Sequence, residues 1–257
     1  MKLAIIQFAP EFGDVQSTIE KLEPLLLKTK KADLIVLPEL ANTGYNFDSK
    51  EQAFDLSETI RESKFLNFLK KKCEKYSFAI VTGFAEKQEE KLYNSSVLID
   101  KTGVKSVYRK LHLFMNEKNI FEPGNIDLSV VNYKGMKLGM LICFDWMFPE
   151  TWRKLALQGA ELILHPSNLI LPYAQSVIPS YALVNRIFIA TANRIGEEKN
   201  LKFTGQSIVA GVKGEILAKA QESEEILMLE INPKDAQNKM VTPLNDSFKD
   251  RRTDKYE

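Results

Sequence analysis

The chain has 257 residues, in which 35 Lys and Arg residues balance 34 Asp and Glu residues to a formal net charge of +1. A balanced charge is not typical of proteins that coat DNA or RNA, and two cysteines are too few for a disulfide framework. Only two histidines, His112 and His165, are present, which leaves few candidates for a metal site or a His-based catalytic triad.

The N-terminal segment lacks the features of a signal peptide. Its apolar run, Leu3–Ala9, is interrupted by Gln7, and no small-residue cleavage site follows. No other apolar stretch approaches the ~20 residues of a membrane helix. We therefore expect a cytoplasmic protein with reduced thiols and no membrane partner. Because no linker or low-complexity tract divides the chain, we expect residues 1–257 to form a single domain.

Short apolar runs alternate with segments of helical spacing. In the first third of the chain, the pattern predicts a strand at Leu3–Phe8, a helix from Asp14 to about Lys31, a strand at Leu34–Leu37, a helix at Ser63–Tyr76 and a strand at Phe78–Val81. Two hairpins are predicted next, one with strands at Leu92–Ile99 and Val104–Tyr108 and one with strands at Leu128–Val131 and Lys137–Cys143. The remaining elements are a helix at Phe148–Gly159, a strand at Glu161–His165, a helix through about Tyr181–Arg186, and strands at Phe188–Ala192, Gln206–Ala210, Glu215–Lys219 and Glu225–Ile231. Pro24 lies inside the first helix and is expected to kink or split it. The alternation indicates a mixed sheet system covered by helices, and it does not distinguish one sheet from two.

Three polar residues follow the ends of predicted strands, where α/β folds tend to build their sites. Glu39 follows an apolar strand and Pro38, so it is either a surface residue or a partly buried general base with a raised pKa. Lys110 is either a surface lysine or an ammonium that stabilises developing negative charge. Cys143 is either a buried inert thiol or a nucleophile at a strand-to-helix elbow, where backbone N–H groups lower its pKa.

Each of the three residues stands in a local motif. Glu39 lies in Pro-Glu-Leu, Lys110 in Tyr-Arg-Lys-Leu-His-Leu-Phe and Cys143 in Ile-Cys-Phe-Asp-Trp-Met-Phe-Pro-Glu, in this order along the chain. Together these motifs resemble the nitrilase superfamily of carbon–nitrogen hydrolases. The resemblance extends from Leu3 into the C-terminal tail, and it is strongest with small stand-alone nitrilase-like or amidohydrolase-like members.

The resemblance implies an α/β fold, namely a four-layer α-β-β-α sandwich with two central mixed sheets. It also implies a homodimer or higher homo-oligomer, formed through the helix after Pro149 and the helix around Pro179–Arg186. The tail, residues 244–257, would then pack on a neighbouring subunit. No metal and no cofactor is implied, and nucleic acid is not an expected partner.

The resemblance further implies a catalytic triad of Glu39, Lys110 and Cys143. Cys143 is expected to attack the substrate carbon while Glu39 takes the thiol proton. Lys110 and the backbone N–H of Phe144 are expected to stabilise the oxyanion. A thioester then forms, ammonia leaves, and water activated by Glu39 releases the acid. This arrangement needs one cysteine and no histidine.

A second glutamate often assists catalysis in the family. By position it corresponds to Glu117, and Glu122 is the alternative, although its place beside the Pro-Gly turn favours exposure to solvent. One departure from the family pattern is Val184, which stands where many relatives carry a glutamate, so local support of the pocket differs here.

The expected substrate is a small-molecule amide or nitrile. Candidate substrate-binding residues are Tyr45, Phe144, Trp146, Asn168 and Tyr173. Their apolar and aromatic character suggests a small, uncharged or partly apolar substrate, and Arg186 and Arg194 are candidates to meet a carboxylate. The triad itself does not separate nitriles, amides and N-carbamoyl compounds.

Other functions stay open at this point. One is an amidohydrolase of N-carbamoyl amino acids or amines, and another is a non-catalytic binding protein on the same fold. A third is a conventional Cys-His or metal-dependent hydrolase that uses His112 or His165. The reactivity of Cys143 compared with that of Cys73 separates a hydrolase from a binding protein.

Overall fold

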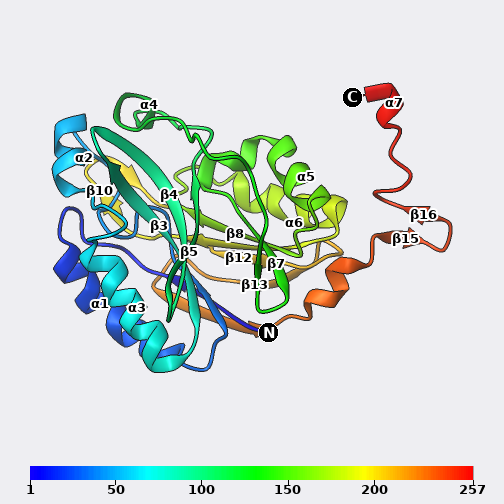
Figure 1. Ribbon diagram of the computed structural model, residues 1–257, viewed down its shortest axis with the longest axis horizontal. Coiled ribbons are helices and arrows are strands. Elements are labelled where there is room, and N and C mark those ends of the chain that lie inside the picture. The colour runs from blue at the N-terminus through cyan, green and yellow to red at the C-terminus, as the bar shows by residue number, and fades with distance from the viewer. Residues whose placement is uncertain (257) are drawn as a thin grey trace.

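The computed structural model describes residues 1–256 and contains two six-stranded mixed sheets (Figure 1). The first sheet has the strand order β14–β1–β2–β3–β4–β5. Its strands are β1 (Lys2–Gln7), β2 (Leu34–Val36), β3 (Ala79–Gln88), β4 (Lys91–Asp100), β5 (Gly103–Arg109) and β14 (Glu225–Glu230). The first three run parallel to one another, whereas β4, β5 and β14 pair antiparallel with their neighbours.

The second sheet repeats this arrangement with the order β13–β12–β9–β8–β7–β6. Its strands are β6 (Val131–Tyr133), β7 (Met136–Met140), β8 (Leu162–Ser167), β9 (Phe188–Asn193), β12 (Ile208–Ala210) and β13 (Ile216–Lys219). β7, β8 and β9 are parallel, and the remaining pairs are antiparallel. Two short ladders stand apart, β10 (Glu197–Glu198) with β11 (Leu201–Lys202) and β15 (Met240–Thr242) with β16 (Asn245–Asp246).

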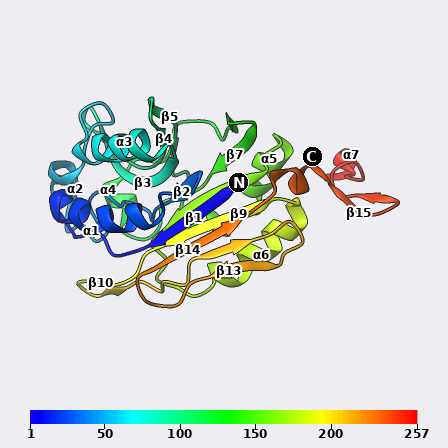
Figure 2. The same cartoon turned by 90° about the horizontal axis from the view of Figure 1, so that it is seen from below.

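Helices cover the outer face of each sheet, which confirms the four-layer α-β-β-α sandwich (Figure 2). Helices α1 (Val15–Lys28) and α3 (Lys64–Tyr76) lie on the first sheet, and α5 (Pro149–Leu157) and α6 (Ala174–Asn185) lie on the second. Successive side chains of a strand point to opposite faces of its sheet, so β1 contributes to two hydrophobic cores. Leu3 and Ile5 pack between the sheets, whereas Ala4 and Ile6 pack beneath the helices.

The remaining helices are short. They are α2 (Lys50–Leu56), α4 (Glu117–Ile120), α7 (Thr253–Tyr256) and the 3-10 helices η1 (Cys143–Met147) and η2 (Pro233–Gln237). The sequence pattern did not predict α2 or α4, since neither is long enough to show a helical period clearly.

The first helix begins where the sequence indicates but is not split by its proline. The Asp14 carboxylate accepts a hydrogen bond from the Ser17 N–H at 3.0 Å, so Asp14 caps α1. Pro24 lies within the continuous helix, on its exposed side. Water can satisfy the backbone carbonyl that loses its partner there, and the expected split of the helix was wrong.

Two predicted strands were placed incorrectly. The strand expected at Lys137–Cys143 ends at Met140, and Cys143 instead begins η1. The strand expected at Leu128–Val131 has only its last residue in β6, which extends to Tyr133. Both errors arise because buried loop segments carry the same apolar residues as strands.

The C-terminal hairpin extends away from the sandwich (Figure 1), whereas Phe248, which follows the hairpin, packs against Arg153 of α5. This hairpin, β15 with β16, projects from the main body beyond α5 and α6, and Leu244 at the turn is 90 % exposed. Glu257, the final residue of the expected tail, lies outside the described residues. Within residues 1–256, no helix combines the length and apolar character needed to cross a membrane.

Candidate active site

The glutamate, lysine and cysteine singled out above follow strands of both sheets. Glu39 lies shortly after β2 and Lys110 directly after β5, both in the first sheet, whereas Cys143 lies shortly after β7 in the second. All three are buried, with exposed fractions of at most 4 %. The fold therefore brings together, between its two sheets, three residues that are far apart in the sequence.

Lys110 is held between two carboxylates. Its Nζ lies 2.7 Å from Glu39 Oε1 and 2.8 Å from Glu117 Oε1, and its side chain is completely buried. Burial by itself lowers the pKa of a lysine, but the carboxylates of Glu117 and Glu39 outweigh burial and raise the pKa of Lys110. The ammonium is therefore charged at every physiological pH.

Glu39 uses one carboxylate oxygen for its contacts and leaves the other free. Oε1 accepts hydrogen bonds from Lys110 and, at 2.7 Å, from the side-chain amide of Asn94. Among the described residues, none donates a hydrogen bond to the buried Oε2. Since buried polar atoms are rarely left unpartnered, this oxygen is an acceptor available to an incoming proton.

Two glycines allow these side chains to sit where they do. A Cβ on Gly83 of β3 would lie 2.2 Å from Glu39 Cα, and a Cβ on Gly124 would lie 2.1 Å from the carbonyl oxygen of Arg109. Gly124 also donates its N–H to the Lys110 carbonyl at 2.8 Å. Any larger residue at either position would push the neighbouring backbone, and with it Glu39 or Lys110, out of place.

Of the two glutamates considered as the fourth residue, the structure brings Glu117 to the cluster and not Glu122. Glu117 is buried and accepts a hydrogen bond from the Tyr45 hydroxyl at 2.8 Å in addition to that from Lys110. Burial raises the pKa of Glu117 and the nearby Glu39 charge adds to this effect, against the opposing charge of Lys110. Glu122 is half-exposed and pairs with Lys50 at 3.1 Å.

Cys143 lies at a sharp bend between β7 and α5. Its φ angle of 39° falls in the left-handed region, which residues other than glycine seldom adopt. Burial raises the pKa of the Cys143 thiol, and the Glu39 carboxylate raises it further, although the Lys110 charge partly offsets both effects. This direction is opposite to the lowering expected for an elbow thiol. The thiol therefore keeps its proton at neutral pH and needs a base to remove it.

A buried aspartate that the sequence analysis overlooked fixes this bend. Asp145 Oδ2 accepts hydrogen bonds from the Tyr108 hydroxyl at 2.7 Å and from the Ile142 N–H at 3.0 Å. Its Oδ1 lies 2.8 Å from Nδ1 of His112. Tyr108 is at the end of β5, two residues before Lys110, so the Asp145 carboxylate ties the segment that carries the lysine to the segment that carries Cys143.

The sequence of this chain was compared with models of known protein families. The family model described as carbon-nitrogen hydrolase matches residues 2–239. The chain belongs to the carbon–nitrogen hydrolase family. The amino-acid sequence of this hydrolase is 43 % identical to that of a nitrilase of Pyrococcus abyssi, and the alignment covers 100 % of the chain and 99 % of that nitrilase. It is 32 % identical to an (R)-stereoselective amidase of a Pseudomonas species, over 90 % of the chain and 85 % of the amidase.

Solved structures of enzymes superpose on this hydrolase along its whole length. A carbon-nitrogen hydrolase from Helicobacter pylori has a TM-score of 0.88 at 29 % identity and covers 100 % of this chain and 96 % of its own. An amidase from a Nesterenkonia species has a TM-score of 0.82 at 26 % identity, with 99 % and 94 % covered. In one mutant of that amidase, acrylamide has added to the active-site cysteine.

A cavity of about 240 Å³ opens beside Cys143. It is lined by Phe114, Cys143, Phe144, Trp146, Met147, Asn168, Leu169, Ile170, Leu171 and Tyr173. Four of the five predicted substrate-binding residues are therefore at this cavity, including Tyr173 at its edge, which is 57 % exposed. The fifth, Tyr45, lines a neighbouring cavity of about 200 Å³ that also contains Glu117.

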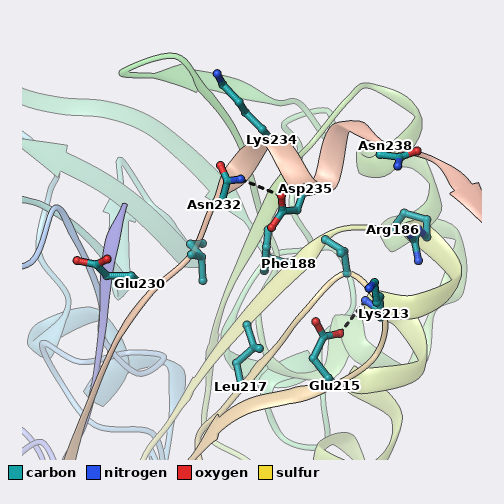
Figure 3. Close-up of a pocket in the computed structure, with 12 residues that line it drawn as sticks. Arg186, Phe188, Lys213, Glu215, Leu217, Glu230, Asn232, Lys234, Asp235 and Asn238 are labelled. Atoms are coloured by element: carbon teal, nitrogen blue, oxygen red, sulfur yellow. Dashed lines mark hydrogen bonds between the residues drawn. The ribbon is translucent and has the colours of Figure 1, made fainter.

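Neither arginine considered as a carboxylate contact reaches this cavity. Arg194 is buried and forms an ion pair with Glu198. Arg186 ends α6 and lines a different cavity of about 500 Å³, where Lys213, Glu215 and Asp235 also gather (Figure 3). That cavity contains no cysteine and mixes charges of both signs, so we do not connect it with the chemistry at Cys143.

His165 is part of the support of the bend. Its Nε2 lies 2.9 Å from the carbonyl oxygen of Cys143, which can only accept, so this nitrogen carries the proton. Nδ1 then accepts from the Thr191 hydroxyl at 3.0 Å. Burial lowers the pKa of His165 to about 4, because the charged imidazolium would lie in the core. The ring is therefore neutral and structural at neutral pH.

This lowered pKa predicts an acid-sensitive fold. In the unfolded chain His165 binds a proton near its ordinary pKa of about 6.5, whereas in the folded state it does so only near 4. The free energy of unfolding should therefore fall by about 2 kcal/mol from this residue between about pH 7.5 and about pH 5. Urea unfolding at both pH values measures the change, and the His165→Gln variant should lose that part of it. An equal pH dependence in the variant would contradict the assignment.

Proposed function

We propose that this protein hydrolyses the carbon–nitrogen bond of a small-molecule amide or nitrile, with Cys143 as nucleophile, Glu39 as general base and acid, and Lys110 as oxyanion stabiliser. One observation carries the proposal: Glu39 Oε2 is buried and unpartnered among residues 1–256, while Oε1 is held by Lys110. A buried carboxylate with one satisfied and one free oxygen is suited to receive the thiol proton.

The first half of the reaction forms the thioester. For an amide, Cys143 Sγ bonds to the carbonyl carbon while its proton moves to Glu39 Oε2. The carbonyl oxygen takes the electron pair of the broken π bond, and Lys110 Nζ and the Phe144 N–H stabilise its charge. When the carbonyl re-forms, the C–N bond breaks, and the proton from Glu39 passes to the departing nitrogen, which leaves as ammonia.

The second half releases the acid. Water attacks the thioester carbon as Glu39 takes one of its protons. Lys110 Nζ and the Phe144 N–H stabilise the oxyanion of this second tetrahedral intermediate as they do the first. The C–S bond then breaks, and the proton returns from Glu39 to the sulfur. Glu117 acts as a positioning residue in this scheme: it accepts a hydrogen bond from Lys110 at 2.8 Å and helps to keep that ammonium charged and oriented.

Selective alkylation tests the proposal. At neutral pH, iodoacetamide should modify Cys143 with loss of ammonia release, while Cys73 stays unmodified. Cys73 is an internal control: it is also buried with a raised pKa, of about 12, but it packs in the core, whereas Cys143 lines the cavity and has the Glu39 carboxylate nearby. Peptide mass spectrometry locates the label, and ammonia release is followed over amides, nitriles and N-carbamoyl compounds. Equal reactivity of the two thiols, without turnover, would favour a binding protein on this fold.

We also infer a homodimer formed through α5 and α6. Exposed apolar side chains on these helices support it, namely Leu157, Leu183 and Val184, each more than 40 % exposed. Sedimentation should show a dimer of the 29.3 kDa chain, and Leu183→Glu should shift it to monomer because a charge would have to be buried. A monomeric wild-type protein would contradict the inference.

The C-terminal tail belongs with this assembly. We infer that the tail, residues 244–257, packs on a neighbouring subunit, and the extended position of its hairpin supports this (Figure 1).

We infer separately that the protein is cytoplasmic, since both cysteines are free thiols and thiols stay reduced in that compartment.

A further inference from the structure

We propose that the substrate is a primary carboxamide whose acyl group is uncharged and apolar, with about ten heavy atoms enclosed by the cavity beside Cys143. This inference rests on the proposed hydrolysis at Cys143 and specifies its substrate class. It is carried by four observations: the apolar walls of the cavity beside Cys143, the volume of that cavity, the pairing of three buried cations, and one unpartnered amide oxygen.

The walls of the cavity are apolar and partly aromatic. Phe144, Trp146 and Leu169 form them close to Cys143, and none of the described residues that line the cavity carries a full charge at neutral pH. Phe144 is held between two other rings, with its centroid 4.9 Å from that of Phe114 and 5.6 Å from that of Phe148. Fixed walls of this kind favour an acyl group that gains from leaving water.

The cavity volume indicates how much of the substrate is enclosed, whereas the exposed edge at Leu171 and Tyr173 leaves room for atoms that extend into solvent. An apolar protein cavity of about 150 Å³ accommodates benzene, which has six heavy atoms. By the same ratio, the volume of about 240 Å³ at Cys143 accommodates about ten heavy atoms.

The cations that surround the site are already paired. Lys110 contacts two carboxylates, and Arg194 contacts Glu198. Arg109, next to Lys110 in the chain, contacts Glu86 through two nitrogens, at 2.9 and 2.5 Å. Within residues 1–256, a substrate carboxylate would therefore find none of these three buried cations unpaired.

The charge of the central cluster adds to this barrier. Glu39 and Glu117 together offset the single positive charge of Lys110, so the cluster is neutral or negative overall. An anionic acyl group gains no attraction from it, and burying an unpaired carboxylate is strongly unfavourable. The structure therefore selects against acyl groups that end in a carboxylate.

Asn168 supplies the preference for an amide over a nitrile. It is 2 % exposed and lines the cavity, and its Nδ2 donates to the backbone carbonyl of Glu39 at 3.0 Å. Because that carbonyl can only accept, the contact fixes which end of the Asn168 amide is nitrogen. The opposite atom, Oδ1, is buried and has no partner among residues 1–256. A primary carboxamide offers N–H donors to this oxygen, and a nitrile has none.

Three matched compounds test the proposal. Isocaproamide and succinamate have the same heavy-atom connectivity and a similar size, since the two methyl groups of the first replace the two carboxylate oxygens of the second. Isocapronitrile differs from isocaproamide only in the reacting group. For the wild-type enzyme, kcat/KM from ammonia release should be at least about 10³-fold higher for isocaproamide than for succinamate, and higher than for isocapronitrile.

A charge-introducing variant provides the complementary test. Leu171 lines the cavity and is 43 % exposed, so an arginine fits there with its charge near solvent. Leu171→Arg should raise kcat/KM for succinamate at least tenfold and lower it for isocaproamide. Leu171→Gln is the uncharged control. It should lower kcat/KM for isocaproamide without raising kcat/KM for succinamate.

The outcomes separate this inference from the proposed function. If succinamate or isocapronitrile is hydrolysed by the wild-type enzyme as fast as isocaproamide, the substrate class is wrong while Cys143 hydrolysis stands. If none of the three compounds releases ammonia and Cys143 resists alkylation, the proposed function fails and the substrate class fails with it. If Cys143 is alkylated but isocaproamide is not hydrolysed, the substrate class alone is overturned.

Discussion

Replacing Cys143 with alanine is expected to abolish ammonia release while leaving the fold intact. In our scheme the thiol is the only group that bonds to the substrate carbon, and removing the nucleophile of a hydrolase lowers kcat by about 10⁴-fold or more. The substitution deletes a single sulfur atom at a position whose backbone φ of 39° strains cysteine and alanine alike. The melting temperature should therefore change by no more than a few degrees.

The matched control is Cys73→Ala. Cys73 is completely buried in α3 and packs in the core beneath the first sheet, so its loss should lower stability by roughly 1 kcal/mol and leave kcat near the wild-type value. Steady-state ammonia release and thermal unfolding of both variants make the comparison. Turnover by Cys143→Ala at the rate of the wild-type protein would rule out the mechanism.

Lys110→Met should produce the second large effect, on both rate and stability. Removing one oxyanion donor costs a hydrolase about 10²- to 10³-fold in kcat. The variant also leaves Glu39 and Glu117 buried together without their shared cation, and breaking a buried ion pair from one side costs about 3–5 kcal/mol. Kinetic measurements well below the melting temperature, with urea unfolding in parallel, separate the two effects.

Arg109→Met is the control for this experiment. Arg109 precedes Lys110 in the chain and is likewise buried against a carboxylate, that of Glu86, but no step of the proposed reaction uses it. We expect a comparable loss of stability and a much smaller loss of kcat. If Lys110→Met and Arg109→Met reduced kcat equally, the charge of Lys110 would be structural and not part of the reaction.

The sequence predicted most of this architecture because the informative signals are local. Short apolar runs located most strands of both sheets, and the polar residues that follow β2, β5 and β7 identified Glu39, Lys110 and Cys143 as candidates. The family resemblance was needed to divide the strands between two sheets, since an apolar run within one strand carries no information about which sheet the strand joins.

What the sequence could not predict depends on contacts across long separations. Asp145 reads locally as a helix-start residue, and only the structure reveals that it binds Tyr108, 37 residues earlier. Arg194 looked available to a substrate because its partner, Glu198, lies in a short ladder that the pattern did not predict. The role of Gly83 is equally invisible in the sequence, since the atom that it must not displace belongs to Glu39.

The division of the site between the two sheets has a consequence for how the enzyme fails. Glu39 and Lys110 follow strands of one sheet and Cys143 follows a strand of the other, and the hydrogen bonds from Tyr108 to Asp145 and from Asn168 to the Glu39 carbonyl hold the two parts together. A slip of about 1 Å between the layers that broke these contacts would separate nucleophile from base while every ladder hydrogen bond survived. Circular dichroism would not register such a shear. The rate of ammonia release should therefore respond to a misalignment of the two sheets that the secondary-structure signal does not detect. On heating or under pressure, we expect activity to be lost before the chain unfolds.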